Sequence, residues 1–161
     1  MNTSSGIEPR IVRREKFLVM RTMTRIQPGT ESGEQFASIW NGFETHRERI
    51  ERHSTDQKYY GVSLPTADEG RFDYVAGMAI SPVQAIPDGL VVREVPAATY
   101  AVFARPVAAI GQTYHYIFGE WRSSSSHQID NSAPAFEQYP PASNVEVPVL
   151  IHIPIHENQA K

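Results

Sequence analysis

The residue best suited to chemistry in this sequence is Glu137, which stands among aromatic side chains in the segment Pro134-Ala-Phe-Glu-Gln-Tyr139. Removing a carboxylate from water costs several kcal/mol or more unless a partner compensates, so a glutamate among rings usually has a specific role. The pattern is typical of a pocket for cations. The alternative is a salt bridge or a solvent-facing strand position, which glutamate occupies in most proteins.

Other reactive arrangements are not favoured. The chain has no cysteine, which excludes disulfides, thiolate metal sites and a cysteine nucleophile. His152 and His156 lie about 13 Å apart on a strand that rises about 3.3 Å per residue, too far to share a metal ion. No glycine-rich phosphate loop is visible, and the serines at 123–126 lack the glycines of a hydrolase nucleophile elbow. We expect neither a metal nor a cofactor.

Composition predicts a globular protein of one domain. The chain has 161 residues, of which 40% are hydrophobic and 20% charged. A net charge of −3 and a pI near 6.1 argue against direct contact with nucleic acid. The first residues lack the apolar core of a signal peptide, and no run approaches the roughly 20 apolar residues of a membrane span. We therefore expect a cytoplasmic protein without membrane contact.

The elements that must position Glu137 occur as two similar halves. Each half predicts two short strands, a helix and two further strands: 11–20, then 58–64 and 72–80 in the first half, and 90–103, then 135–139 and 145–155 in the second. The apolar residues at helical spacing are Phe36, Ile39, Trp40, Phe43 and Ile50 in the first helix, and Ile110, Tyr114, Ile117, Phe118 and Trp121 in the second.

Neither half can bury its sheet well alone, so the two should pack by pseudo-two-fold symmetry around a central groove. We predict an α+β fold with antiparallel sheets and two main helices. It forms one domain over 1–161, with halves at about 7–81 and 89–155 and short flexible tails. Pro148 and Pro154 cannot donate to a ladder, which predicts that strand 145–155 lies near an edge or that these prolines lie at bulges. At an edge it could pair with a second chain into a homo-oligomer.

Four ordered motifs carry a family resemblance over about 7–155. They are Phe72-Asp-Tyr-Val-Ala-Gly77, Pro96-Ala-Ala-Thr-Tyr100, Tyr116-Ile-Phe-Gly-Glu-Trp121, and Ala133-Pro-Ala-Phe-Glu-Gln-Tyr139 with its closing Val-Glu-Val-Pro-Val strand. Together they resemble the GyrI-like small-molecule-binding family, also described as the AraC-type effector-binding domain. The resemblance implies a bacterial protein, a duplicated module with a central groove, and a pocket glutamate at the position of Glu137.

The function implied is that of a stand-alone binding protein for bulky aromatic or lipophilic cationic compounds. A carboxylate attracts the cation, and each ring face adds about 0.5–2 kcal/mol of cation–π attraction. Phe72 and Tyr74 share a strand face, where core packing suffices to explain Phe72 and the Tyr74 hydroxyl suits a pocket. The candidate ligand-binding residues are Glu137, Trp121, Tyr74, Trp40, Tyr139, Tyr100, Tyr116 and Phe72.

Two alternatives stay open. The first is a hydrolase of cyclopropane-bearing genotoxins, in which Glu137 with a raised pKa is the catalytic acid or base, assisted by Tyr100, Tyr116 or Tyr139. The second is an interaction protein, like the gyrase-inhibiting members of the family, or a transcriptional regulator that acts through a protein partner. The Glu137→Gln substitution separates these alternatives, because an interaction through the outer surface does not need the carboxylate.

Overall fold

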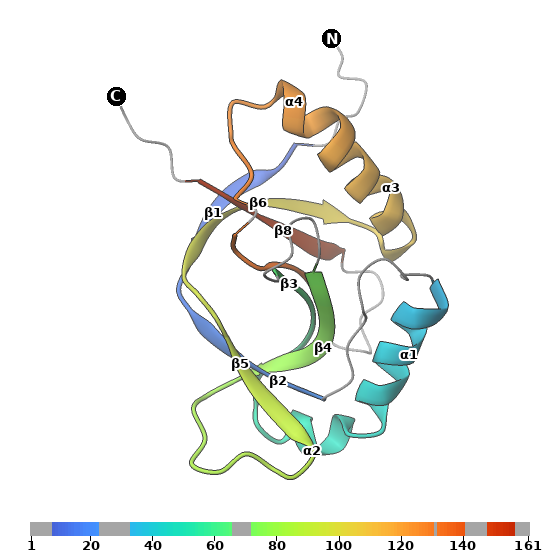
Figure 1. Ribbon diagram of the computed structural model, residues 1–161, viewed down its shortest axis with the longest axis vertical. Coiled ribbons are helices and arrows are strands. Elements are labelled where there is room, and N and C mark those ends of the chain that lie inside the picture. Colours follow the sequence, from blue (N-terminus) through green and yellow to red (C-terminus); the bar gives the residue numbers. More distant parts are fainter. Residues whose placement is uncertain (1–7, 23–32, 66–71, 131, 141–147, 157–161) are drawn as a thin grey trace.

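The computed structural model describes residues 8–22, 33–65, 72–130, 132–140 and 148–156 (Figure 1). Eight strands form one antiparallel sheet in the order β1-β6-β8-β7-β3-β4-β2-β5. They are β1 (Arg10–Arg14), β2 (Phe17–Thr22), β3 (Ser54–Pro65), β4 (Phe72–Ile80), β5 (Leu90–Val95), β6 (Ala98–Arg105), β7 (Ala135–Tyr139) and β8 (Val149–Ile155). The helices are α1 (Gly33–Glu44), α2 (Arg47–Glu51), α3 (Ile110–Tyr116) and α4 (Arg122–Ser124).

The strand order confirms the predicted duplication. When β1 to β4 are exchanged with β5 to β8, the order reads the same from the opposite end of the sheet. The pseudo-two-fold axis therefore passes between β3 and β7. The first strand of each half pairs with the other half, β1 with β6 and β5 with β2. Because of this exchange, the two halves share one continuous sheet, and the α+β class is as predicted.

The sheet curls back on itself, because two short connections join strands at its opposite ends. Three residue steps separate the end of β1 at Arg14 from the start of β2 at Phe17, a span of at most about 11 Å. The connection from β5 to β6 is equally short. The inner face of the curl is an apolar core around Tyr60, Tyr100 and Phe136, none more than 1% exposed. Both ends of the sheet enclose this core (Figure 1).

The helices cover the outer face of the curl (Figure 1). Helix α1 packs on β4 and β2, where Ile39 and Phe43 are buried with Met78. On the other half, a π-helical segment, Ile117–Trp121, continues α3 and buries Trp121 against Phe103 of β6. These two satellite cores leave the centre of the sheet, at β3 and β7, between the two helices.

Two expectations about the elements are wrong in detail. The predicted first helix, with apolar positions from Phe36 to Ile50, divides, since α1 ends at Glu44 and α2 spans Arg47–Glu51. At the break, the Thr45 hydroxyl donates to the Gly42 carbonyl at 2.8 Å. This bond takes the place of the helical bond from the His46 N–H, which donates to the Phe43 carbonyl instead.

The predicted edge strand at 145–155 is the second correction. Strand β8 begins at Val149 and lies between β6 and β7, so β1 and β5 are the edges of the described sheet; residues 145–147 lie outside the described ranges. Pro148 precedes the strand. Pro154 pairs with Tyr100 of β6 but lies beyond the residues that pair with β7, where its missing N–H costs no ladder bond on that side.

Candidate functional site

Glu137 stands at the middle of β7 on the helix-covered face of the sheet, where it is only 5% exposed. Its carboxylate accepts hydrogen bonds from three tyrosine hydroxyls. Tyr74 and Tyr139 donate to Oε1 at 2.8 and 2.9 Å, and Tyr114 of α3 donates to Oε2 at 2.5 Å. We call Glu137 with these tyrosines the tyrosine clasp. Because its members come from β4, β7 and α3, the clasp joins both halves of the fold.

Gly61 makes room for the clasp from the neighbouring strand. It is the register partner of Glu137 across the β3–β7 pair. A β-carbon at this position would lie 1.9 Å from the Tyr74 hydroxyl and 2.7 Å from Glu137 Oε1. Since real β-carbons do not approach other atoms so closely, only glycine allows Tyr74 to cross the strand and reach the carboxylate.

Electrostatics at the clasp reflect burial opposed by hydrogen bonding. Burial raises the pKa of Glu137 above its usual value, while the hydroxyls of Tyr114, Tyr74 and Tyr139 oppose the rise. Burial, with the nearby carboxylate, also raises the pKa of each tyrosine, so all three stay protonated donors at neutral pH. When Glu137 is ionised, the clasp holds its negative charge in a low-dielectric setting, where the attraction for a cation is stronger than in water.

An aromatic cavity of about 380 Å³ adjoins the clasp. Trp40 packs edge-to-face on Phe43 and Tyr139, with centroids 5.8 and 5.4 Å apart. Tyr139 belongs to both sites, because its side chain lines the cavity while its hydroxyl binds Glu137. Burial raises the pKa of Tyr74 and Trp40 opposes that rise, which gives a second link between the cavity and the clasp. The residues that line the cavity are Trp40, Phe43, Glu44, Arg47, Tyr59, Ile110 and Tyr139.

Charged side chains mark the outer wall of the cavity. Arg47 Nε lies 3.2 Å from Glu44 Oε1, and Arg47 Nη1 lies 3.8 Å from Glu51 Oε2. The Tyr59 hydroxyl also donates to Glu51, at 3.2 Å. Two carboxylates thus flank one guanidinium, so this cluster carries no net positive charge.

The structure brings together four of the predicted site residues: Glu137, Tyr74, Tyr139 and Trp40. Tyr100 does not join them, because it lies on the inner face of the curled sheet, with its buried hydroxyl unpartnered among the described residues. Trp121 and Tyr116 pack in the satellite core under α3. The backbone of Phe72 opens β4, but its side chain lies outside the described residues.

Sequence reasoning missed Tyr114 and Gly61 as functional residues. Tyr114 lies in the apolar stripe of its helix, a pattern that core packing explains equally well. Its hydroxyl was the available signal, because a tyrosine in a buried stripe needs a hydrogen-bond partner. Gly61 carried the signal of a glycine within a strand, which often marks a close approach by another group.

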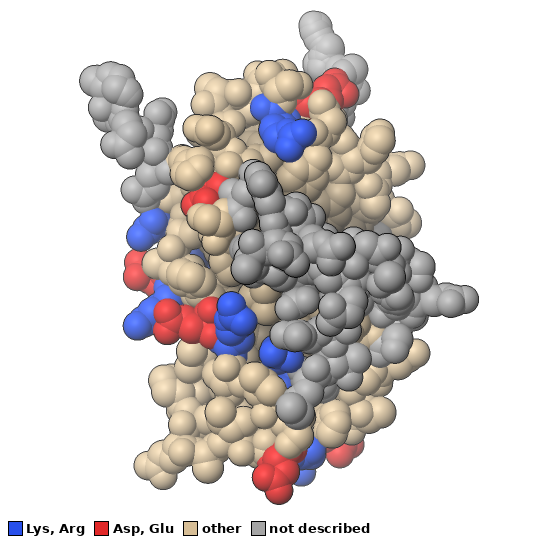
Figure 2. Space-filling model, in the orientation of Figure 1, with Lys and Arg blue, Asp and Glu red and all other residues tan. Residues whose placement is uncertain are grey.

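The described residues contain no group of three His, Asp or Glu side chains arranged to hold a metal ion. Within the same ranges no helix is long and apolar enough to cross a membrane. Figure 2 shows the described basic and acidic side chains interspersed on the face in view, without a basic patch there.

A duplicated α+β fold with a buried carboxylate beside a central aromatic cavity defines an effector-binding domain. Comparison with known families agrees with this class and with the resemblance noted in the sequence. Residues 10–155 match the family model of Cass2, the integron-associated effector binding protein, and the chain belongs to that family of small-molecule-binding, GyrI-like proteins.

Similar proteins include a transcriptional regulator and a ligand-bound structure. The transcriptional regulator BrlR of Pseudomonas aeruginosa is 29% identical over 92 residues, which are 56% of this chain and 34% of BrlR, so the match spans about a third of that relative. A structure of SAV2435 bound to tetraphenylphosphonium superposes with a TM-score of 0.75 at 16% identity, over 93% of this chain and 94% of that one. An integron cassette protein from the mobile metagenome of Vibrio cholerae superposes with a TM-score of 0.68 at 18% identity. The match covers 92% of this chain and 96% of that protein.

Proposed function

We propose that this protein binds bulky aromatic or lipophilic organic cations in the cavity beside the tyrosine clasp. The observation that carries the proposal is the double role of Tyr139, whose side chain lines the cavity while its hydroxyl holds the buried Glu137 carboxylate. A cation against this wall is attracted by the ring and by the charge behind it. The cavity, at about 380 Å³, falls in the range of small-molecule sites, about 300–1,000 Å³.

The clasp also predicts which cations bind. A small, strongly hydrated ion would have to lose its water and compete with three hydroxyls for the carboxylate. A large cation with a delocalised or shielded charge gives up little hydration. It gains apolar burial against Trp40, Phe43 and Tyr59, together with cation–π attraction of about 0.5–2 kcal/mol per ring. The site should therefore select for size and charge rather than for one chemical identity.

The relatives support this proposal and suggest a setting. SAV2435 shares the fold and was solved with tetraphenylphosphonium, a bulky aromatic cation. BrlR is a transcriptional regulator, which favours a role in sensing, with the bound state passed to the transcription apparatus through a protein partner. The named relatives come from Pseudomonas and Vibrio, which favours a bacterial protein, and the proposed role in regulating transcription favours the cytoplasm.

A matched pair of ions tests the charge requirement. Tetraphenylphosphonium and tetraphenylborate have the same shape and opposite charge, so the ratio of their affinities isolates electrostatics from apolar contact. Wild type should bind the phosphonium at least about tenfold more tightly, a difference of about 1.4 kcal/mol. Glu137→Gln should abolish that preference. Glu120→Gln, which removes an exposed charge from the α3 side, should retain it.

A preference that survives in Glu137→Gln would refute the role of the carboxylate, and failure of wild type to bind the phosphonium would refute the proposal.

The raised pKa of Glu137 also suits a general acid or base, which keeps a hydrolase as the second candidate function. A cyclopropane-bearing compound is therefore incubated with wild type and Glu137→Gln and followed for product by mass spectrometry. Product that depends on Glu137 would make the protein a hydrolase.

A further inference from the structure

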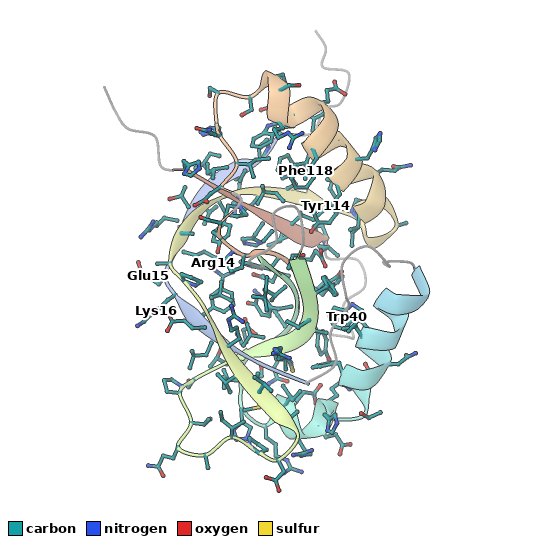
Figure 3. The ribbon with its side chains drawn as sticks, in the orientation of Figure 1. Arg14, Glu15, Lys16, Trp40, Tyr114 and Phe118 are labelled. Atoms are coloured by element: carbon teal, nitrogen blue, oxygen red, sulfur yellow. The ribbon has the colours of Figure 1, made fainter. Side chains whose placement is uncertain are left out.

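The side of α3 that carries a cavity residue and a clasp residue extends beyond Tyr114 to Phe118. Ile110, Tyr114 and Phe118 are four residues apart, and four residues of an α-helix advance only about 40° past a full turn. Ile110 lines the cavity, and the Tyr114 hydroxyl binds Glu137. Phe118 is the next residue on the same strip. Figure 3 labels Tyr114 and Phe118 on the sheet side of this helix, as it does Trp40 on α1.

Phe118 and Tyr114 form a stacked pair of rings. Their planes differ by 5° and their centroids lie 6.3 Å apart. Phe118 is nevertheless 38% exposed, whereas Ile117 and Trp121, on the neighbouring strip of the same segment, are 0% and 7% exposed. Phe118 does not line the cavity itself, and neither do Ile11 and Ile86, the other large apolar side chains exposed in the described ranges; of the three, Phe118 stacks on a residue of the tyrosine clasp. Phe118 thus combines an exposed ring face with continuity to the site.

The π-helical segment Ile117–Trp121 explains how the buried residues of this helix stay on one side of it over several turns. In a continuous α-helix the 40° advance every four residues would turn Trp121 away from the position of Thr113. A π turn, with i→i+5 hydrogen bonds, advances less per residue and offsets the drift. Thr113, Ile117 and Trp121 all stay buried, while the neighbouring strip of Ile110, Tyr114 and Phe118 is less buried. Such π segments are rare and frequently occur at functional sites.

We propose that Tyr114 and Phe118 form a ring-binding subsite, which takes an aryl group of the same ligand whose cationic part occupies the cavity. This inference rests on the proposed function and adds a determinant of ligand size. The exposed face of Phe118 accepts a further ring in a stacked or edge-on arrangement, while Tyr114 connects this ring to the carboxylate. Phe118 is then a specificity-determining residue for extended, multi-ring cations.

Two phosphonium probes that differ by one tethered ring test the subsite. Propyltriphenylphosphonium and (3-phenylpropyl)triphenylphosphonium carry the same cationic centre. Calorimetry on wild type should show about threefold to tenfold tighter binding of the tethered ring, the range that one aromatic pair contributes. Phe118→Ala should lose this preference with unchanged affinity for the propyl compound, and Phe118→Trp should keep it. Ile86→Ala, which truncates an exposed apolar side chain elsewhere, should behave as wild type.

The outcomes separate the two proposals. Binding of the propyl compound without any preference for the tethered ring, or a preference that persists in Phe118→Ala, would overturn the subsite while the proposed function stands. Binding of neither compound to wild type would overturn the proposed function and the subsite with it. The thermal unfolding midpoint of each variant shows that the chain is folded, and Phe118→Trp distinguishes loss of the ring from a general effect of substitution at this position.

Discussion

The substitution Gly61→Ala tests the geometry of the clasp most directly. The new β-carbon would lie 1.9 Å from the Tyr74 hydroxyl and 2.7 Å from both the Tyr74 ring and Glu137 Oε1, where ordinary contact begins near 3.4 Å. Tyr74, only 3% exposed, must move by more than 1 Å in a packed environment. Overpacking of this kind costs about 1–3 kcal/mol, and loss of a hydrogen bond to a charged group costs about 1.5–3. Together these give an expected loss of about 2.5–6 kcal/mol.

Urea unfolding measures this loss, with two comparisons built into the chain. Gly111→Ala makes the same chemical change on α3, where no atom lies within 4 Å of the added carbon, and helix propensity should make it neutral or stabilising by up to about 1 kcal/mol. Tyr74→Phe should cost less in the Gly61→Ala background than in wild type, since the hydroxyl bond is already broken there. If Gly61→Ala unfolds within about 0.5 kcal/mol of wild type, the close approach of Tyr74 is wrong.

Two predictions concern pH. Because burial raises the pKa of Glu137, the affinity for tetraphenylphosphonium should rise with pH as this carboxyl ionises, a rise that calorimetry should not detect in Glu137→Gln; equal pH profiles would contradict the assignment. Burial lowers the pKa of His152 from 6.5 to about 4, so the unfolded chain binds a proton that the folded chain does not. The free energy of unfolding should therefore fall as the pH drops from 6.5 to 4, by about 3 kcal/mol from this group. His152→Leu should remove that part of the acid sensitivity in urea titrations, and an undiminished loss would count against it.

Local pattern predicted most of the fold. Period-2 alternation and helical stripes located each strand and both main helices, and their repetition indicated the duplication. The position of β8 was not readable, because Pro148 and Pro154 signal an edge unless the neighbouring strand is known to stop short of them. The break between α1 and α2 was not readable either, because no proline marks it. A hydrogen bond from the Thr45 hydroxyl to the Gly42 carbonyl closes the turn there.

The site was predictable only in part, for a physical reason. The curled sheet buries both of its faces, so alternation along a strand does not reveal which face meets the ligand. Tyr100 and Tyr74 are both buried tyrosines on strands, yet they lie in different cores. Glu137 stood out because a carboxylate is unusual in either core. The partners that compensate its burial come from separate elements, and only the folded arrangement of β4 and α3 brings them to it.

The pairing of Gly61 with Glu137 has a consequence for how such a site can arise. A homodimer of two identical half-chains would place the same residue on both sides of its symmetry axis, so a glutamate there would face a glutamate. Two facing carboxylates resist ionising together, and the symmetric ancestor could not hold one defined charge. Fusion of the halves into one gene lifts this restriction, because each copy can then diverge. Glycine in one half and glutamate in the other give a repeated fold a single, unrepeated carboxyl group, so the proposed function implies one ligand for each chain.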